Sequence, residues 1–166
     1  LDRAADAVAA SQAGTVGLAA VAMFALCSLA LRSARLGAVA MVPNVLPVLV
    51  FFGTLGFGVA PLSLPTSLIA NAILGISIDD TAHYLLRYRG ERRLGHAPEV
   101  AIARATGAVG RPISLAAAML VLGFGSVALS EFETLRQFGL LSAWTLAVCI
   151  TADLLLLPAM LVRWRL

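Results

Sequence analysis

Two adjacent carboxyl groups, Asp79 and Asp80, lie in the segment GISIDDTAHYLLRYR, residues 75–89. They follow the uncharged run 61–78, and apolar and aromatic residues continue after them. We therefore expect both acids inside a membrane-spanning helix, toward its cytoplasmic half. An ionised carboxylate there costs at least about 2.5–3.5 kcal/mol, so an acid at this depth is a candidate functional group. If the helix ended early instead, both acids would be merely interfacial.

Proton carriage is the chemistry that suits this pair. Removal from water and a neighbouring negative charge both favour the protonated form of a carboxyl group. The two acids would titrate as a coupled unit. Gain or loss of a proton changes the charge of a helix in a field worth about 2.3 kcal/mol per charge per 100 mV. We therefore predict that Asp79 and Asp80 form a proton relay that can drive helix movement.

Polar and small residues recur every four positions around this pair and form a ridge on one side of the predicted helix: Ser67, Asn71, Gly75, Asp79 and His83. Such a ridge is unfavourable toward lipid, so we expect it to face the bundle centre or a hydrated cavity. Gly75 would let a neighbouring backbone approach closely. Asp80 lies about 100° further around the helix and aligns with Tyr84.

Two further titratable groups have more than one interpretation. His83 could extend the relay, or it could hydrogen-bond near the membrane interface. Asp153, in the segment TADLLLLPAM, could accept a bond from another helix or join the relay. It could equally be a protonated or hydrogen-bonded packing residue beside a kink at Pro158. With two histidines and no ligand spacing, the sequence predicts no metal site and no cofactor.

Backbone-shaping residues occur in two other segments. In VPNVLP, Pro43 and Pro47 should kink a helix and free backbone carbonyls. Asn44 would satisfy a freed group or line a cavity, and a structural role is favoured. Gly123 and Gly125 are interpreted as close-packing positions, because no phosphate-binding context surrounds them.

The composition excludes several classes of protein. The chain has 166 residues, of which 60% are hydrophobic and 13% charged, with a mean hydropathy of +0.94. A soluble domain averages roughly 45–50% apolar and about 25% charged, and a disordered chain is far less hydrophobic. A nucleic-acid binder would gather its basic residues on one solvated face, whereas here the 12 arginines lie at the ends of apolar runs. The composition therefore predicts an integral membrane protein.

Uncharged runs define the membrane-spanning segments. A spanning helix needs about 20 mostly apolar residues. Charges are absent from 7–31, 36–78 and 112–130, and Asp153 alone interrupts 137–162. Pro61 and Pro65 divide the longest run. We predict an all-α bundle without strands, with five spans: 14–31, 36–60, 64–86, 113–130 and 140–162.

Arginine placement predicts the orientation. All of the 12 except Arg3 and Arg136 fall on one side, which should be cytoplasmic. The N-terminus then lies outside and the C-terminus inside. The largest cytoplasmic loop is 87–111, in which the third helix should continue to about Arg93 and end at Gly95. A short surface helix over 98–109 would follow, as a coupling element or a plain connector.

The segment GISIDD with TAHYLLRYR resembles a helix motif of the resistance-nodulation-division (RND) superfamily, and above all of its MMPL-type exporters, which are related to Patched-like and sterol-sensing proteins. RSARLGAVAMVPNVLP, VGRPI, SEFETLRQFGLLSAWT and ADLLLLPAML resemble further segments of the same five-helix block, in the same order. The resemblance covers nearly all of the chain from about Gly14. It implies the membrane block of the C-terminal half, with residues 1–13 as the tail of an extracytoplasmic domain.

The resemblance also implies a function and partners. MMPL-type exporters use the proton-motive force to export lipids or hydrophobic compounds, so this chain is expected to be a fragment of a secondary active transporter, not an enzyme. Asp79 matches the proton-relay acid of the family, and Asp80 the second acid of its double-Asp variant. Expected partners are membrane lipids, the hydrophobic substrate, protons and the remaining half of the transporter, in a bacterial plasma membrane, without nucleic acid. Some drug-efflux members place a lysine opposite the acids, and this chain has no lysine.

Two alternatives remain open at the level of sequence. A sterol-sensing-type block would bind lipid and regulate a partner without pumping. An intramembrane aspartyl protease would use Asp79 and Asp153 as a catalytic dyad in near contact.

Overall fold

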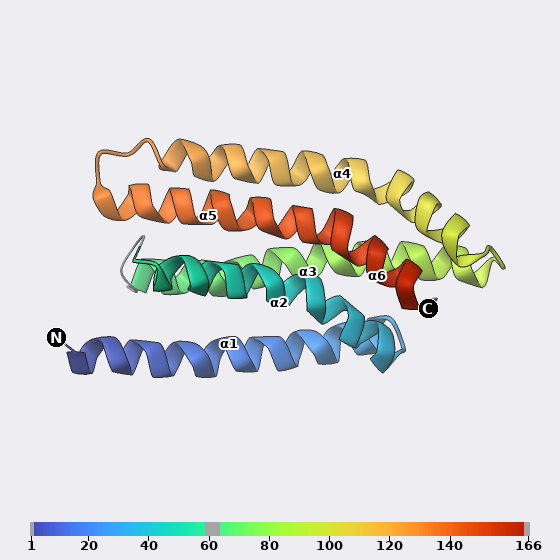
Figure 1. Ribbon diagram of the computed structural model, residues 1–166, viewed down its shortest axis with the longest axis horizontal. Helices are drawn as coiled ribbons and strands as arrows, with labels where there is room; N and C mark the ends of the chain where they lie inside the picture. The colour runs from blue at the N-terminus through green and yellow to red at the C-terminus, as the bar shows by residue number, and fades with distance from the viewer. Residues whose placement is uncertain (1, 59–63, 165–166) are drawn as a thin grey trace.

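The computed structural model describes residues 2–58 and 64–164, which form helices joined by short turns, with no strand among them. The helices lie side by side along the long axis of the molecule, and each runs antiparallel to the one before it in the chain until α5, which continues through a π-helix into α6 (Figure 1). The elements are α1 (Asp2–Ala30), α2 (Ala34–Gly56), α3 (Leu64–Arg93), α4 (Pro98–Val127), α5 (Glu133–Thr151), η1 (Ala152–Leu156) and α6 (Leu157–Trp164).

Apolar character makes this bundle a membrane protein. In the described part of the chain, three helical segments are long and apolar enough to cross a membrane: Ala34–Gly56, Pro98–Val127 and Glu133–Arg163. The apolar part of α1 covers Gly14–Ala30, and α3 is more polar because it carries the acid pair and an arginine-rich end. The predicted all-α membrane fold is therefore confirmed. The five spans and their orientation stay predictions.

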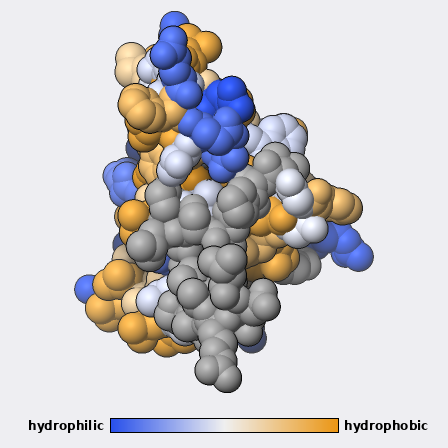
Figure 2. Space-filling view, turned by 90° about the vertical axis from the view of Figure 1, so that its left-hand side faces the viewer, coloured by the Kyte–Doolittle hydropathy of each residue, from blue (hydrophilic) through white to orange (hydrophobic). Residues whose placement is uncertain are grey.

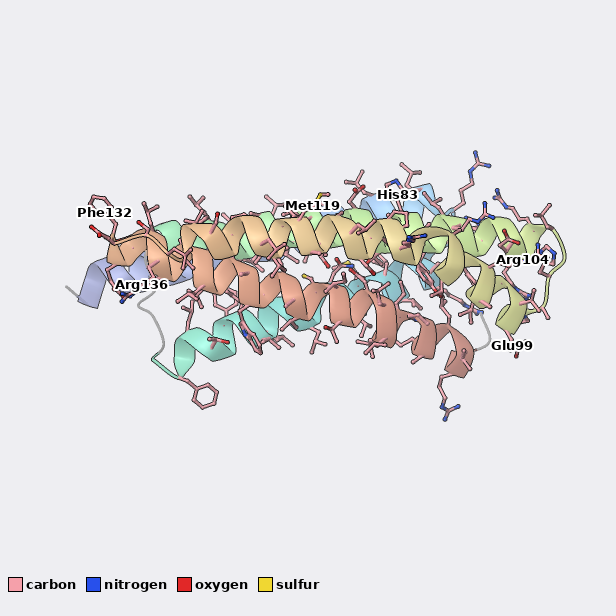
Figure 3. All side chains as sticks on the ribbon, turned by 90° about the horizontal axis from the view of Figure 1, so that it is seen from above. His83, Glu99, Arg104, Met119, Phe132 and Arg136 are labelled. Atoms are coloured by element: carbon pink, nitrogen blue, oxygen red, sulfur yellow. The ribbon has the colours of Figure 1, made fainter. Side chains whose placement is uncertain are left out.

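Large apolar side chains lie on the outside as well as in the core. Leu18, Leu49, Met119, Leu122 and Leu155 are all more than half exposed, as expected of helices that face lipid. Figure 2 looks onto the end that carries the α4–α5 turn and shows hydrophilic residues there beside hydrophobic flanks. In Figure 3, Phe132 and Arg136 mark this end, Glu99 and Arg104 mark the opposite end, and Met119 and His83 lie between.

Helix α2 runs through both of its prolines. Pro43 and Pro47 lie inside it, and Figure 1 shows that its first turns slant relative to the remainder. It ends at Gly56, a few residues before the predicted boundary at 60, which falls outside the described residues together with the predicted break at Pro61. Pro65 belongs to the first turn of α3, where its missing N–H removes no helical hydrogen bond.

The segment expected as a loop between the third and fourth spans is mostly helical. As predicted, α3 continues to Arg93, Gly95 has a positive φ of 86°, and α4 begins at Pro98. The expectation of a separate surface helix over 98–109 was wrong, because α4 runs without a break through Pro112 to Val127. Buried alanines precede Pro112 and buried residues follow it, so packing along both parts holds the helix together despite the lost hydrogen bond.

Helices α4 and α5 approach each other closely at Gly139. A Cβ atom at this position would lie 2.4 Å from the backbone nitrogen of Ala128 and 2.7 Å from the carbonyl oxygen of Phe124. The close packing expected at Gly123 and Gly125 was wrong, because a Cβ at either position meets no described atom within 4 Å. Periodicity could not show which side of α4 faces α5.

We predict that Gly139→Ala lowers the free energy of unfolding by about 1–3 kcal/mol, because the new methyl group forces two backbones apart. The measurement is thermal unfolding of the full-length protein in detergent micelles. Gly123→Ala is the matched control, and we expect it to be neutral or stabilising because open space surrounds it. Equal unfolding temperatures for Gly139→Ala and the wild type would contradict the close approach.

A buried carboxylate holds the α3–α4 turn. Glu91 is 3% exposed, and its Oε1 lies 2.7 Å from Nη2 of Arg87. Its Oε2 lies 3.1 Å from Nδ1 of His96 and 3.5 Å from Nη1 of Arg104. Three basic side chains from α3, the turn and α4 therefore converge on one acid and tie the two helices together at this end. We call this group of four residues the Glu91 clamp.

Substitution of Glu91 by Gln should loosen this end of the bundle. We expect a loss of about 1–3 kcal/mol in the free energy of unfolding, since the charge-assisted bonds disappear while the half-exposed arginines stay solvated. Unfolding of the full-length protein is again the measurement. Glu99→Gln, an exposed acid on the first turn of α4, is the control and should stay within about 0.5 kcal/mol. Similar losses in both variants would disprove the clamp.

Candidate functional site

The acid pair lies at the midpoint of α3 and lines an open groove of about 660 Å³ between α1, α3 and α4. The remaining walls are apolar or weakly polar: Met23, Leu26, Cys27 and Ala30 from α1, Ile76, Ile78 and Ala82 from α3, and Ala116 and Leu120 from α4. Asp79 and Asp80 therefore lie beside the apolar part of α1, before that helix ends. The groove therefore places mostly apolar side chains beside two carboxyl groups and leaves one side open.

The two acids differ in their exposure. The side chain of Asp79 is 73% exposed, whereas Asp80 is only partly exposed. Nδ1 of His83 lies 2.8 Å from the backbone oxygen of Asp79 and 3.3 Å from its Oδ1. Asp80 interacts electrostatically with both Asp79 and His83. The pair and the imidazole therefore form one electrostatic unit along the groove.

The predicted ridge on α3 faces outward. Gly75 and Asp79 line the groove, His83 is exposed, and Asn71 is half-buried with an unpartnered Oδ1. The ridge therefore points toward the open groove and not into the centre of this bundle, and the side chain of Ser67 lies outside the described residues. A Cβ on Gly75 meets no described atom within 4 Å, so the close backbone approach stays a prediction.

Tyr84 connects α3 to α4. Its side chain is fully buried, and its hydroxyl lies 2.7 Å from Oγ1 of Thr106. Although Tyr84 is one turn beyond Asp80, its hydroxyl is engaged with α4. The geometry gives it a packing role between the helices, and a contribution to a relay remains a prediction.

The inner side of α3 carries a buried chain of hydrogen bonds. Nδ2 of Asn44, in α2, donates to the backbone oxygen of Ala40 at 2.6 Å and to Oγ1 of Thr81 at 3.1 Å. The Thr81 hydroxyl donates in turn to Oδ1 of Asp153 at 2.5 Å. Asn44, Thr81 and Asp153 are each at most 1% exposed. Three helical segments are therefore joined by one polar chain inside an apolar core.

Asp153 belongs to the π-helical segment η1, in which the helix widens just before Pro158; the predicted kink at that proline stays a prediction. The backbone N–H of Leu157 bonds to the oxygen of Ala152, five residues earlier. Pro158 has no N–H to give to residue 154, so the turn before it relaxes to the wider spacing. This local change of register accompanies the position of Asp153 against α3.

Asp79 and Asp153 are not arranged as a catalytic dyad. Thr81, the partner of Asp153, lies about 200° around α3 from Asp79. Asp79 faces the open groove, whereas Asp153, from η1, is buried against the opposite side of α3. Within residues 2–58 and 64–164, no three His, Cys, Asp or Glu side chains converge as metal ligands would.

Comparison with known proteins places this architecture. The model of the MMPL family matches residues 3–164. The chain belongs to the MMPL family. It is also 31% identical over 122 residues to a protein of Methanocaldococcus jannaschii that carries the name "Putative membrane protein MJ1562". The alignment covers 74% of this chain but 31% of that relative, so the chain spans about a third of its length.

Sequence reasoning on this MMPL chain missed Thr81. The residue directly follows the acid pair, but its hydroxyl points to the inner side of α3 and joins Asn44 to Asp153. The available signal was the need of each buried polar group for a partner. Asn44 and Asp153 lacked obvious partners in their own segments, and a hydroxyl in the neighbouring helix could supply one to both.

We predict that Thr81→Val, which is nearly isosteric, lowers the free energy of unfolding by about 1–3 kcal/mol or more, because buried atoms of Asn44 and Asp153 lose their shared partner. Thr81→Ser is the matched control, since it keeps the hydroxyl and should retain most of the stability. The two variants are compared by thermal unfolding of the full-length protein. If Val and Ser cost the same, the hydroxyl does not join the helices.

Proposed function

We propose that this chain is the five-helix membrane block of the C-terminal half of a proton-driven MMPL-type exporter of lipids or hydrophobic compounds. The observation that carries this proposal is the carboxyl pair at the midpoint of α3, in a groove whose other walls are apolar. An acid placed among hydrocarbon changes the energy of its helix when it binds or releases a proton. This is the property that a proton-driven transporter needs.

Asp79 and Asp80 have the exposures expected of successive relay groups. Asp79 is open to the groove and can exchange protons with any water that enters it. Asp80 is the next residue, is less exposed and interacts electrostatically with Asp79. Because two adjacent negative charges repel, the proton affinity of one acid depends on the state of the other. His83 supports the pair from one turn away.

The partners follow from the length of the chain and the distribution of charge. Because the chain spans about a third of the relative's length, we assign the extracytoplasmic domain and a second helical block to the rest of the protein. The arginine-rich end, which includes the turns after α1 and α3, would face the cytoplasm of a bacterium. The open side of the groove would then face the other half of the exporter or membrane lipid.

Asp79→Asn in the full-length protein should reduce export to background while insertion and abundance stay normal, because the amide cannot carry a proton. The measurement pairs export of a hydrophobic substrate with proton flux in vesicles. Glu133→Gln is the control, because that acid lies at the opposite end of the bundle and bonds to Arg136 and Gln137. We expect it to export normally.

Undiminished export by Asp79→Asn would disprove the relay. If the wild-type protein itself binds lipid at normal abundance but does not pump, a sterol-sensing-type regulatory block would be supported instead.

A further inference from the structure

Asp153 is a buried acid with one unused oxygen. Its side chain is 1% exposed, and its Oδ1 accepts the hydroxyl hydrogen of Thr81. Its Oδ2 is fully enclosed and has no hydrogen-bond partner among the described residues. Thr81 has no second hydrogen for Oδ2, because its one hydroxyl hydrogen goes to Oδ1 while its oxygen accepts from Asn44. The hydrogen bonds among Asn44, Thr81 and Asp153 therefore leave Oδ2 without a hydrogen.

The groups that face Asp153 supply no positive charge. Asp80 interacts with it electrostatically from α3, and Cys149 does so from α5. Asn44, from α2, reaches it through Thr81, and the neighbouring Leu154 lies near Gly110 of α4, where a Cβ would be 3.8 Å from its Cδ2. Within the described part of the chain, no arginine or histidine pairs with Asp153. An ionised Asp153 would be a buried, unpaired charge that faces a second acid, which is far less favourable than a neutral one.

We propose that Asp153 is a second proton-binding site, that it carries a proton on Oδ2 in this conformation, and that this proton keeps α2, α3 and η1 joined through Thr81. The site is separate from the groove, because it lies on the opposite side of α3 from Asp79. The inference does not depend on the export function, since it rests on the hydrogen-bond and charge inventory of the buried chain.

The position of Asp80 connects the two sites. It is the residue between Asp79 and Thr81 and interacts electrostatically with Asp79 and with Asp153. Negative charges on Asp80 and Asp153 would repel each other, so the charge states of the two sites are linked. Release of that proton would place charge on the enclosed Oδ2, so water has to enter or η1 has to move away from α3. Release of the proton from Asp153 would thus loosen the hydrogen bonds by which Thr81 joins α2, α3 and η1.

Infrared spectroscopy of the full-length protein in lipid nanodiscs tests the proton directly. At near-neutral pH the wild type should show the carbonyl stretch of a protonated carboxyl group that disappears in Asp153→Asn and persists in Asp79→Asn. The amide of Asp153→Asn keeps an oxygen acceptor for Thr81, so its unfolding temperature should stay near that of the wild type. A spectrum that does not change in Asp153→Asn overturns the proposal.

A second variant keeps the test decisive if Asp153→Asn does not fold. Thr81→Val removes the hydrogen bond to Oδ1, so the same carbonyl stretch should shift to higher frequency; an unshifted stretch overturns the proposal. Sodium chloride and choline chloride at equal ionic strength test for a bound cation. A sodium-specific rise in unfolding temperature, together with a missing carboxyl stretch, would show an ionised Asp153 with a metal ion and would also overturn it. Loss of export alone bears only on the relay at Asp79.

Discussion

The packing of α2, α3 and η1 depends on how the buried polar groups between them find partners, because apolar side chains and lipid offer none. The Thr81 hydroxyl is a partner for two other elements, since it accepts from Asn44 and donates to Asp153. Without it, Asn44 would lose its hydrogen bond to α3, and Asp153 would lose the hydrogen bond to its Oδ1. The polar chain therefore specifies how these segments are rotated, which apolar contacts alone do weakly.

Three consecutive residues carry α3 from its open side to its buried side. Asp79 is largely exposed in the groove, Asp80 is intermediate and Thr81 is fully buried. Each step turns the side chain by about 100° around the helix axis. The acid pair and the buried hydrogen bonds of Thr81 therefore lie within less than one turn of α3. A change of charge on Asp79 or Asp80 therefore occurs within two residues of Thr81 and its buried hydrogen bonds.

The sequence alone predicted the helices and most of the polar residues of the candidate site. Long uncharged runs predicted the helices, and Gly95 and Pro98 marked the end of α3 and the start of α4. Asn44 and Asp153 were recognised as groups that need partners. Their common partner was not recognised, because periodicity defines the faces of each helix but not how neighbouring helices are rotated toward one another.

The same limitation explains the misplaced glycines and the divided fourth helix. Gly123 and Gly125 have the residue type of a close contact but open space around them, whereas a Cβ on Gly139 would meet backbone atoms of Phe124 and Ala128. The uncharged run that begins at 112 predicted a span that begins at 113. Periodicity and charge did not show that buried residues on both sides of Pro112 belong to one continuous helix.

Attachments on two sides of α3 restrict how it can move. The Glu91 clamp and the Tyr84–Thr106 hydrogen bond join it to α4 near the arginine-rich end. Thr81 joins the other side to α2 and η1. On this side, the backbone of η1 is π-helical, and the N–H of Leu157 bonds to the oxygen of Ala152 five residues earlier. On the proposal that Asp153 carries a proton, the bond between Thr81 and Asp153 is the contact on this side of α3 that a change of protonation would alter.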